Sequence, residues 1–287
     1  MSRMTNRRRG VRRVVGAAGL GLAAAVLTGC GDLGEGPGRL RLFGLPDASS
    51  QQASHIGNLW VGAWIACLII GVLVWGLMGW SFIRYRRRHA RQVPKQTRYN
   101  LPLEIMYTTV PFLIVGVLFF FTVKTQDAVL SLDQNPPSSH TVNVVGQKWS
   151  WTFNYMNAVN GETVWDAGTV EHTPDLYVPV GETVTFHLNS PDVIHSFWVP
   201  SFYMKLDVVP GRTNTFQVTP NKEGTFAGKC AELCGTYHSA MLFNLRVVPK
   251  AEFDQKMADL QARGQTGEIT GSTGANQLTG LKEEGER

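Results

Sequence analysis

Residues 230–241 decide the fold of this chain and read Cys230-Ala231-Glu232-Leu233-Cys234-Gly235-Thr236-Tyr237-His238-Ser239-Ala240-Met241. This short segment, which we expect to form one loop, places two thiols, an imidazole and a thioether within reach of one another. Thiolate and thioether are soft ligands that favour copper, whereas structural zinc sites use cysteine and histidine in closed tetrahedral sets. The segment therefore predicts a copper centre.

A soft copper site needs a second imidazole, and His195 is the best candidate among the seven histidines. It stands at the end of an alternating apolar and polar stretch, which is typical of a strand. A mononuclear blue-copper site uses one cysteine, two histidines and a weak axial methionine. This loop has a second cysteine, and two bridging thiolates can hold two copper ions.

A disulfide is the alternative for the two cysteines of the loop. Two cysteines outside the cytoplasm usually pair with each other, and Cys230 and Cys234 taken alone would favour that interpretation. The nearby His238 and Met241, together with a histidine at a strand end, favour a metal instead.

The loop resembles the binuclear copper A loop of subunit II of haem-copper cytochrome c oxidases. Every ligand position of that family pattern is present, namely His195, Cys230, Glu232, Cys234, His238 and Met241. The resemblance implies that His195 and His238 each terminate one copper, while Met241 and the backbone carbonyl of Glu232 complete the two coordination spheres. It also implies that the Glu232 carboxylate binds magnesium at the interface with subunit I; a plain surface acid is the alternative.

The first residues indicate export. Residues 1–29 combine six arginines, a short apolar run from Val14 to Leu27 and two small residues, which predicts a signal peptide too short to span a membrane. The ending Leu27-Thr28-Gly29-Cys30 resembles a bacterial lipobox, in which Cys30 is acylated; an ordinary signal followed by a free cysteine is the alternative.

Removal of this segment changes the net charge from +5 to −1, because six arginines and no acid leave with it. The basic character therefore belongs to the precursor, and it does not indicate nucleic-acid binding.

Two apolar runs predict a membrane hairpin. An extracytoplasmic linker is expected at 30–55, a first transmembrane helix at 56–83 and a second at 103–123. The loop between them, 84–102, carries seven positive charges and no acid, and such loops stay cytoplasmic. We therefore expect a multi-pass protein of the plasma membrane, with residues after about Lys124 on the extracytoplasmic side.

The second half of the chain reads as an exported β domain. Residues 124–249 contain alternating stretches separated by glycines, and this pattern predicts a β-sandwich or Greek-key barrel. The resemblance specifies a cupredoxin fold. The predicted fold class is thus membrane-anchored all-β, a two-helix transmembrane hairpin followed by a cupredoxin-like Greek-key β-sandwich. Within 250–287 we expect a short helix to about Arg263 and a disordered tail, because the tail is poor in apolar residues.

Three more residues are candidates for function. Glu104 stands at the inner end of the second span, in a setting that resembles the segment supplying the entrance of the K proton pathway; simple interfacial placement is the alternative. Trp149 belongs to an aromatic cluster that alone would indicate core packing, but it resembles the tryptophan through which electrons enter from cytochrome c. Asp192, beside His195, is interpreted as a docking charge for a basic donor, since the exported part is acidic.

The resemblance implies an electron-transfer function. The chain would accept electrons from cytochrome c at copper A and pass them to haem in subunit I, where oxygen is reduced to water and protons are pumped. The sequence has no Cys-x-x-Cys-His motif for covalent haem, so the oxygen-reducing site belongs to another subunit. Expected partners are subunit I, other oxidase subunits, the lipid membrane and a cytochrome c that is free or membrane-bound in a supercomplex.

Two other functions remain as alternatives. The first is a copper-free structural subunit II of a quinol oxidase, against which the complete ligand set argues. The second is a stand-alone copper electron carrier, or the copper domain of nitrous oxide reductase, against which the two spans and Glu104 argue.

Overall fold

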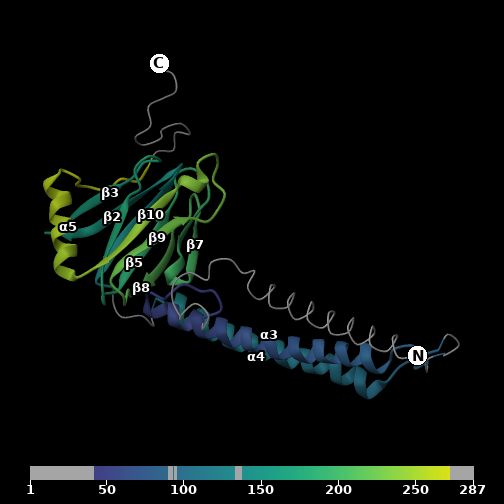
Figure 1. Ribbon diagram of the computed structural model, residues 1–287. Helices are drawn as coiled ribbons and strands as arrows, with labels where there is room; N and C mark the ends of the chain where they lie inside the picture. Colours follow the sequence, from purple (N-terminus) through teal and green to yellow (C-terminus); the bar gives the residue numbers. More distant parts are fainter. Residues whose placement is uncertain (1–41, 90–92, 94–95, 133–137, 272–287) are drawn as a thin grey trace, which may run out of the picture. The chain divides into compact units, whose positions relative to one another are not determined.

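The computed structural model describes residues 42–89, 93, 96–132 and 138–271 (Figure 1). The chain divides into two units, 1–44 and 45–287, and all helices and strands described below lie in the second. The predicted signal peptide at 1–29 and Cys30 lie outside the described residues, as do residues 272–287 of the predicted tail.

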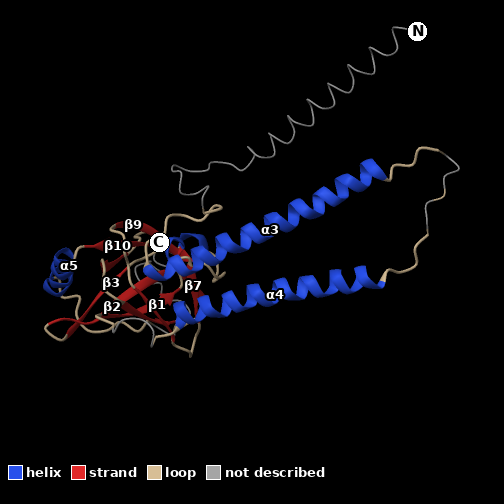
Figure 2. Ribbon diagram, turned by 90° about the horizontal axis from the view of Figure 1, so that it is seen from below, coloured by secondary structure: helices blue, strands red, loops and turns tan. Residues whose placement is uncertain are grey.

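Two long helices, α3 (Gln51–Arg84) and α4 (Leu101–Leu130), are apolar enough to cross a membrane (Figure 2). Their most apolar windows have mean hydropathies of 2.4 and 2.0, and no part of either window is buried within the protein. Long helices whose apolar side chains cover no protein core are suited to lipid. The predicted two-helix hairpin is confirmed, but both helices extend beyond the predicted limits.

Capping side chains set the helix starts. Ser50 accepts a hydrogen bond from the backbone N–H of Ala53 at 3.2 Å, so α3 begins at Gln51 rather than at Ile56. Asn100 caps α4 through a hydrogen bond from the N–H of Leu103, and the Glu104 carboxylate accepts the N–H of Asn100 at 3.0 Å. Glu104 therefore has a structural role at the start of α4, whatever its role in proton transfer.

The second helix also ends later than expected. It continues past the apolar run to Leu130, so the predicted domain boundary at residue 124 is wrong, and the first strand begins only at His140. Polar residues after Lys124 keep the helical conformation, and the N–H of the capping residue Ser131 bonds to the carbonyl of Asp127.

Ten strands follow in the described residues: β1 (His140–Gln147), β2 (Ser150–Val159), β3 (Glu162–Ala167), β4 (Asp175–Pro179), β5 (Val184–Asn189), β6 (His195–Val199), β7 (Met204–Val208), β8 (Asn214–Val218), β9 (Gly224–Cys230) and β10 (Leu242–Val248). They form two five-stranded sheets with the orders β3-β2-β1-β5-β8 and β4-β10-β9-β6-β7. The pairs β1/β5 and β4/β10 are parallel, and the other neighbours are antiparallel. The predicted β-sandwich is confirmed.

Aromatic residues fill the space between the sheets. Phe197 stacks on Phe243 with ring centroids 4.8 Å apart, and Trp151 meets the edge of Phe243 at 5.6 Å. All three side chains are almost fully buried, and each contributes a few kcal/mol through apolar burial. Gly228 on β9 has no room for a side chain, since an added Cβ would lie 2.2 Å from the Phe243 ring. The core thus fixes β6 and β9 against each other.

The residues before α3 are anchored to the sandwich, and we call residues 45–53 the N-terminal joint. The N–H of Ser49 bonds to the carbonyl of Ser201 and its hydroxyl to the Ser201 hydroxyl, at 3.0 and 2.7 Å. Gln52 accepts the N–H of Thr219 at 3.0 Å, and Ser49 and Gln52 are buried. The predicted linker at 30–55 is therefore wrong for its described end, because tertiary hydrogen bonds fix polar residues that carry no periodic signal.

The chain remains ordered after the last strand. Helix α5 (Lys250–Ala262) buries Phe253, Met257 and Leu260 against the sandwich, as its amphipathic pattern predicts. Residues 265–271, which we call the C-terminal strap, bond to β3 and β2. The predicted disorder is wrong for these residues. Backbone groups of β3 and the Asn154 side chain of β2 supply the hydrogen-bond partners that the segment lacks on its own.

Replacing Gln52 with alanine tests the N-terminal joint. The change leaves the buried N–H of Thr219 without its acceptor, which costs about 1–3 kcal/mol. We expect that loss in the free energy of unfolding of the full chain in detergent, measured by denaturant titration of tryptophan fluorescence. Gln51→Ala is the control, since the Gln51 side chain is exposed. Equal stability of the two variants would contradict the role of the joint.

Candidate metal centre

The pairing of β6 with β9 brings the predicted ligands together. Phe197 lies opposite Cys230, so His195 at the start of β6 comes next to the end of β9. Backbone hydrogen bonds hold both ends of the loop after β9: Ala231 donates to the carbonyl of Ser196, and Cys230 donates to the carbonyl of Met241, each at 3.0 Å. The loop is thereby closed over the end of the aromatic core.

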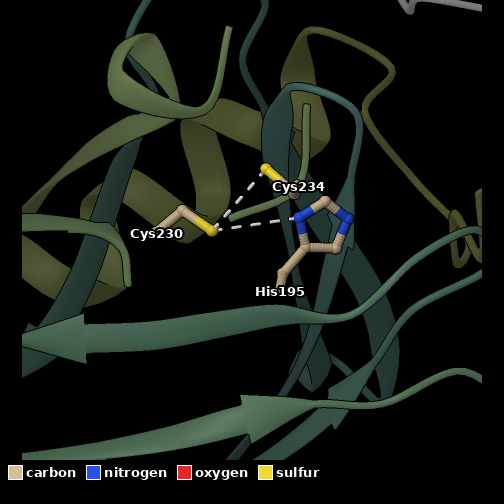
Figure 3. Close-up of side chains that lie close together, drawn as sticks. All are labelled: His195, Cys230 and Cys234. Atoms are coloured by element: carbon tan, nitrogen blue, oxygen red, sulfur yellow. Dashed lines mark hydrogen bonds between the residues drawn. The ribbon is translucent and has the colours of Figure 1, made fainter. Parts of the chain in front are cut away.

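His195, Cys230 and Cys234 point toward one another in a buried cluster (Figure 3). The Sγ of Cys230 lies 3.9 Å from Nδ1 of His195 and 3.9 Å from Sγ of Cys234. Ligand atoms of these three residues all lie within 4.8 Å of one another. Among the described residues, this is the cluster of histidine, cysteine and acidic groups that could hold a metal ion.

The other three predicted ligands surround this cluster. Nδ1 of His238 and Sδ of Met241 lie 3.6 and 3.8 Å from the Sγ of Cys234. The backbone carbonyl oxygen of Glu232 lies 3.2 Å from the Sγ of Cys230, while the Glu232 side chain is exposed. All six residues predicted from the sequence therefore meet at one place.

The spacing of the donor atoms fits metal ligands. Two ligands of one tetrahedral ion, bound at about 2.0–2.3 Å, lie about 3.3–3.8 Å apart. The separations around Cys234 are 3.6–3.9 Å, close to that range. Cys230 and Cys234 carry free thiols, so the disulfide alternative is not adopted. Two sulfurs, two imidazoles and a thioether form a soft donor set that is consistent with copper.

A hydrogen bond links the two thiols. This bond, with help from His195, lowers the pKa of Cys230 well below its usual value, against the effect of burial. The same interaction, together with burial, raises the pKa of Cys234 well above its usual value. Cys230 is therefore the thiol of the pair that ionises first, and the thiolate is the form that binds a soft cation.

The second nitrogen of His195 is bound to a carboxylate. Nε2 lies 2.9 Å from Oδ1 of Asp192. The same Oδ1 accepts the N–H of Val193 at 2.6 Å, and Oδ2 accepts the N–H of Lys148 at 2.8 Å. Burial raises the pKa of Asp192, but these hydrogen bonds outweigh it and lower the value to about 2. Burial lowers the pKa of His195, and the bonds to Asp192 and Cys230 reverse that effect, so the net shift is upward.

This placement argues against the docking role predicted for Asp192. Its side chain is only 10% exposed, and its oxygens are occupied by internal donors. A carboxylate bound to the outer nitrogen of a ligand histidine fixes the ring orientation and tautomer. The spacing Asp192-x-x-His195 is the sequence feature that indicates this contact, whereas the predicted role was that of a surface charge.

Trp149 lies against the metal loop. Its indole N–H donates to the carbonyl of Cys234 at 3.2 Å, and its ring meets the Tyr237 ring edge-on at 5.0 Å. Gly235 permits this close approach, because an added Cβ would lie 3.0 Å from the indole. The aromatic cluster thus divides into two parts: Trp151 is fully buried in the core, and Trp149 is half-buried beside Cys234.

Comparison with known proteins identifies similar sequences along most of the chain. The family model for cytochrome C oxidase subunit II, periplasmic domain, matches residues 140–248, and the model for the transmembrane domain of the same subunit matches residues 39–125.

Individual relatives agree with the family models. A probable cytochrome c oxidase subunit 2 of Streptomyces avermitilis is 45% identical over 293 residues, covering 90% of each chain. Cytochrome c oxidase subunit 2 of Mycobacterium tuberculosis is 34% identical, covering 96% of this chain and 87% of that one. A solved periplasmic domain of subunit II from Bradyrhizobium japonicum is 29% identical, with a TM-score of 0.41, and the match covers 45% of this chain and 97% of that one.

Proposed function

The chain belongs to the cytochrome c oxidase subunit II family, and from this premise we propose that it accepts electrons from cytochrome c at a binuclear copper centre and passes them to haem in subunit I. The observation that carries the proposal is the meeting of six donor groups at the end of β9. In the complete oxidase, these electrons would reduce oxygen to water, coupled to proton pumping.

The number of donors supports two ions rather than one. A single four-coordinate ion would leave two of the six groups without a metal. If both sulfurs are shared, each of two ions receives two sulfurs, one imidazole and one weak ligand, either Met241 or the carbonyl of Glu232. His195 lies beside Cys230 and His238 beside Cys234, which suits one imidazole for each ion.

Copper would supply one-electron redox chemistry at this place. The chain holds the donors nearly fixed, since His195, Cys230, Cys234 and Met241 are buried and both ends of the loop are hydrogen-bonded to strands. A fixed ligand set limits the rearrangement that accompanies each change of charge, and this favours rapid electron transfer. A copper-free structural subunit would have no use for two buried thiols gathered with a buried imidazole and a thioether.

The surroundings of the loop support electron entry through Trp149. Its indole touches the Cys234 carbonyl and is half-buried at the surface of the loop. Three large apolar side chains next to predicted ligands are exposed: Ile194 precedes His195, Leu233 precedes Cys234 and Tyr237 precedes His238. We propose that the donor docks on this apolar rim, so that Trp149 bridges donor and copper loop.

The membrane part completes the proposal. Subunit I and other oxidase subunits would cover the exposed apolar faces of α3 and α4, and the positive loop would lie in the cytoplasm. The sandwich would then stand outside the plasma membrane. Cleavage at residue 29 and acylation of Cys30 stay predictions; an unmodified or uncleaved N-terminus in the mass of the mature chain would exclude them.

Metal analysis tests the copper proposal. We expect two coppers per chain, with one unpaired electron shared between them in electron paramagnetic resonance of the full chain reconstituted in detergent. Cys230→Ser should abolish the binuclear signal, because a hydroxyl cannot replace the bridging thiolate. A Cys230–Cys234 disulfide that persists with ample copper would contradict the proposal.

Two variants serve as matched controls for that experiment. Cys67→Ser removes the free, exposed cysteine of α3 and should leave two coppers. Glu232→Gln keeps the backbone carbonyl, so copper should remain, but the intact complex should lose the magnesium that the Glu232 carboxylate is proposed to bind. Magnesium that survives this change would leave Glu232 as a plain surface acid.

Replacing Trp149 with alanine should slow electron entry at least tenfold while copper content and its resonance signal stay unchanged, because the change removes the aromatic bridge but no ligand. Rapid mixing with reduced cytochrome c measures the entry rate. Trp75→Phe is the control, since that indole is exposed on α3, outside the sandwich and its metal loop. Normal entry in Trp149→Ala would exclude this residue as the electron port.

Glu104→Gln separates the two roles of Glu104. The amide oxygen can still accept the N–H of Asn100, so the cap of α4 persists, whereas the side chain no longer exchanges a proton. We expect slowed turnover of the reconstituted oxidase with unchanged electron entry into copper, and proton uptake measured with a pH dye should fall in parallel. Unchanged turnover would restrict Glu104 to its capping role.

A further inference from the structure

The outer face of the β3-β2-β1 half of the first sheet is covered by the C-terminal strap. Val145 and Asn154 occupy outward positions, since their neighbours Val144, Phe153 and Tyr155 face the core, yet they are only 3% and 0% exposed. An outward face of a sandwich normally meets water. Something must therefore lie across it, and Gln265–Gly271 is the segment bonded there.

The strap is bonded along its length. Its first part adds to the edge strand β3, as Trp165 donates to the carbonyl of Gln265 and Gly267 donates to the carbonyl of Thr163, at 3.0 and 2.9 Å. It then crosses β2, where the Asn154 amide bonds to both the N–H and the carbonyl of Ile269 at 2.8 and 2.9 Å. A buried amide satisfied on both sides holds its partner in one register.

The end of the strap reaches the residues that hold Asp192. An added Cβ on Gly271 would lie 2.7 Å from Cγ of Pro191, 2.9 Å from Oε1 of Gln147 and 3.2 Å from Cγ1 of Val145. Gly271 also has φ of +83°, a conformation that favours glycine. The backbone of the strap is thus pressed between two segments, one ending at Gln147 and the other beginning at Pro191.

These two segments meet at the carboxylate behind the metal ligand. Lys148 follows Gln147, and its N–H donates to Oδ2 of Asp192. Asp192 follows Pro191, and its Oδ1 binds Nε2 of His195. A displacement of either segment would therefore move the Asp192 carboxylate, and with it the imidazole of His195.

We propose that the C-terminal strap is a positioning segment for the copper ligand His195: Gly271 holds the Pro191 loop against the end of β1 and so fixes the Asp192 carboxylate that orients the imidazole. The inference rests on the proposed copper function for its effect on the metal, but the mechanical link is a property of the metal-free chain. The contacts of the strap described above are with β1, β2, β3 and Pro191, so its effect on His195 would be indirect.

The substitution Gly271→Ala tests this link in the full chain, and Gly161→Ala is its matched control. Both glycines have nearly the same positive φ, +83° and +81°, so the backbone strain is alike. Only Gly271 is crowded, because nothing lies within 4 Å of an added Cβ at Gly161. The difference between the variants therefore reports the contact with Pro191 and Gln147.

Two measurements decide the outcome. Amide hydrogen exchange of the metal-free chain should become faster at Lys148 and Val193, the two N–H groups that donate to Asp192, in Gly271→Ala but not in Gly161→Ala. Copper affinity, measured by competition with a chelator, should fall about tenfold, the lower end of the range for partners of metal-bound histidines. The resonance signal of the bound copper should shift with it.

The two proposals fail in different ways. If the unaltered chain bound no copper, the proposed function would fail, and the exchange rates would still decide whether the strap positions Asp192. If Gly271→Ala matched Gly161→Ala in exchange, affinity and signal, the strap would be only a cover for the sheet. A chain ending at residue 264, compared with one ending at residue 271, gives a second test: the shorter chain should show the same local effect in a still folded sandwich, and normal exchange at Lys148 and Val193 would overturn the proposal.

Discussion

The register between β6 and β9 is the constraint on which the metal centre depends. With Phe197 opposite Cys230, the first residue of β6 and the last residue of β9 come to the same end of one sheet. Successive side chains of a strand point to opposite faces, so a slip of one residue would turn His195 away from the cysteines. The stacked rings of Phe197 and Phe243 oppose such a slip. Gly228 also opposes it, because the Phe243 ring packs directly against its backbone and leaves no room for a side chain.

The ligands were predictable because most of them lie within one loop. Short spacing restricts where Cys230, Cys234, His238 and Met241 can go, and their chemistry indicates a soft metal in any such arrangement. His195 lies 35 residues before Cys230, and only its place at a strand end and the family resemblance pointed to it. The strands followed from alternating hydrophobicity and the two membrane helices from long apolar runs, and these patterns depend on burial or lipid contact alone.

The segments that were mispredicted share one physical property. The N-terminal joint and the C-terminal strap are short and polar, so neither could fold alone, and their composition indicated linker and disorder. Their order comes from single tertiary bonds, such as Thr219 to Gln52 and Asn154 to Ile269, between residues more than 100 positions apart. Likewise the helix ends depended on caps at Ser50 and Asn100 rather than on hydropathy.

The contacts around the metal loop do more than cover the core of the sandwich, because they also hold the donor groups in place. The loop at 230–241 contains only a short 3-10 turn, His238–Ala240, so its own secondary structure cannot hold its five donors in place. Rigidity has to come from outside: from the strand bonds at both ends of the loop, from Asp192 behind His195 and from Trp149 against Cys234. Because the metal-free thiols already stand at ligand distances, little binding free energy would be needed to rearrange them, and the same restraint would limit movement in the proposed electron transfer.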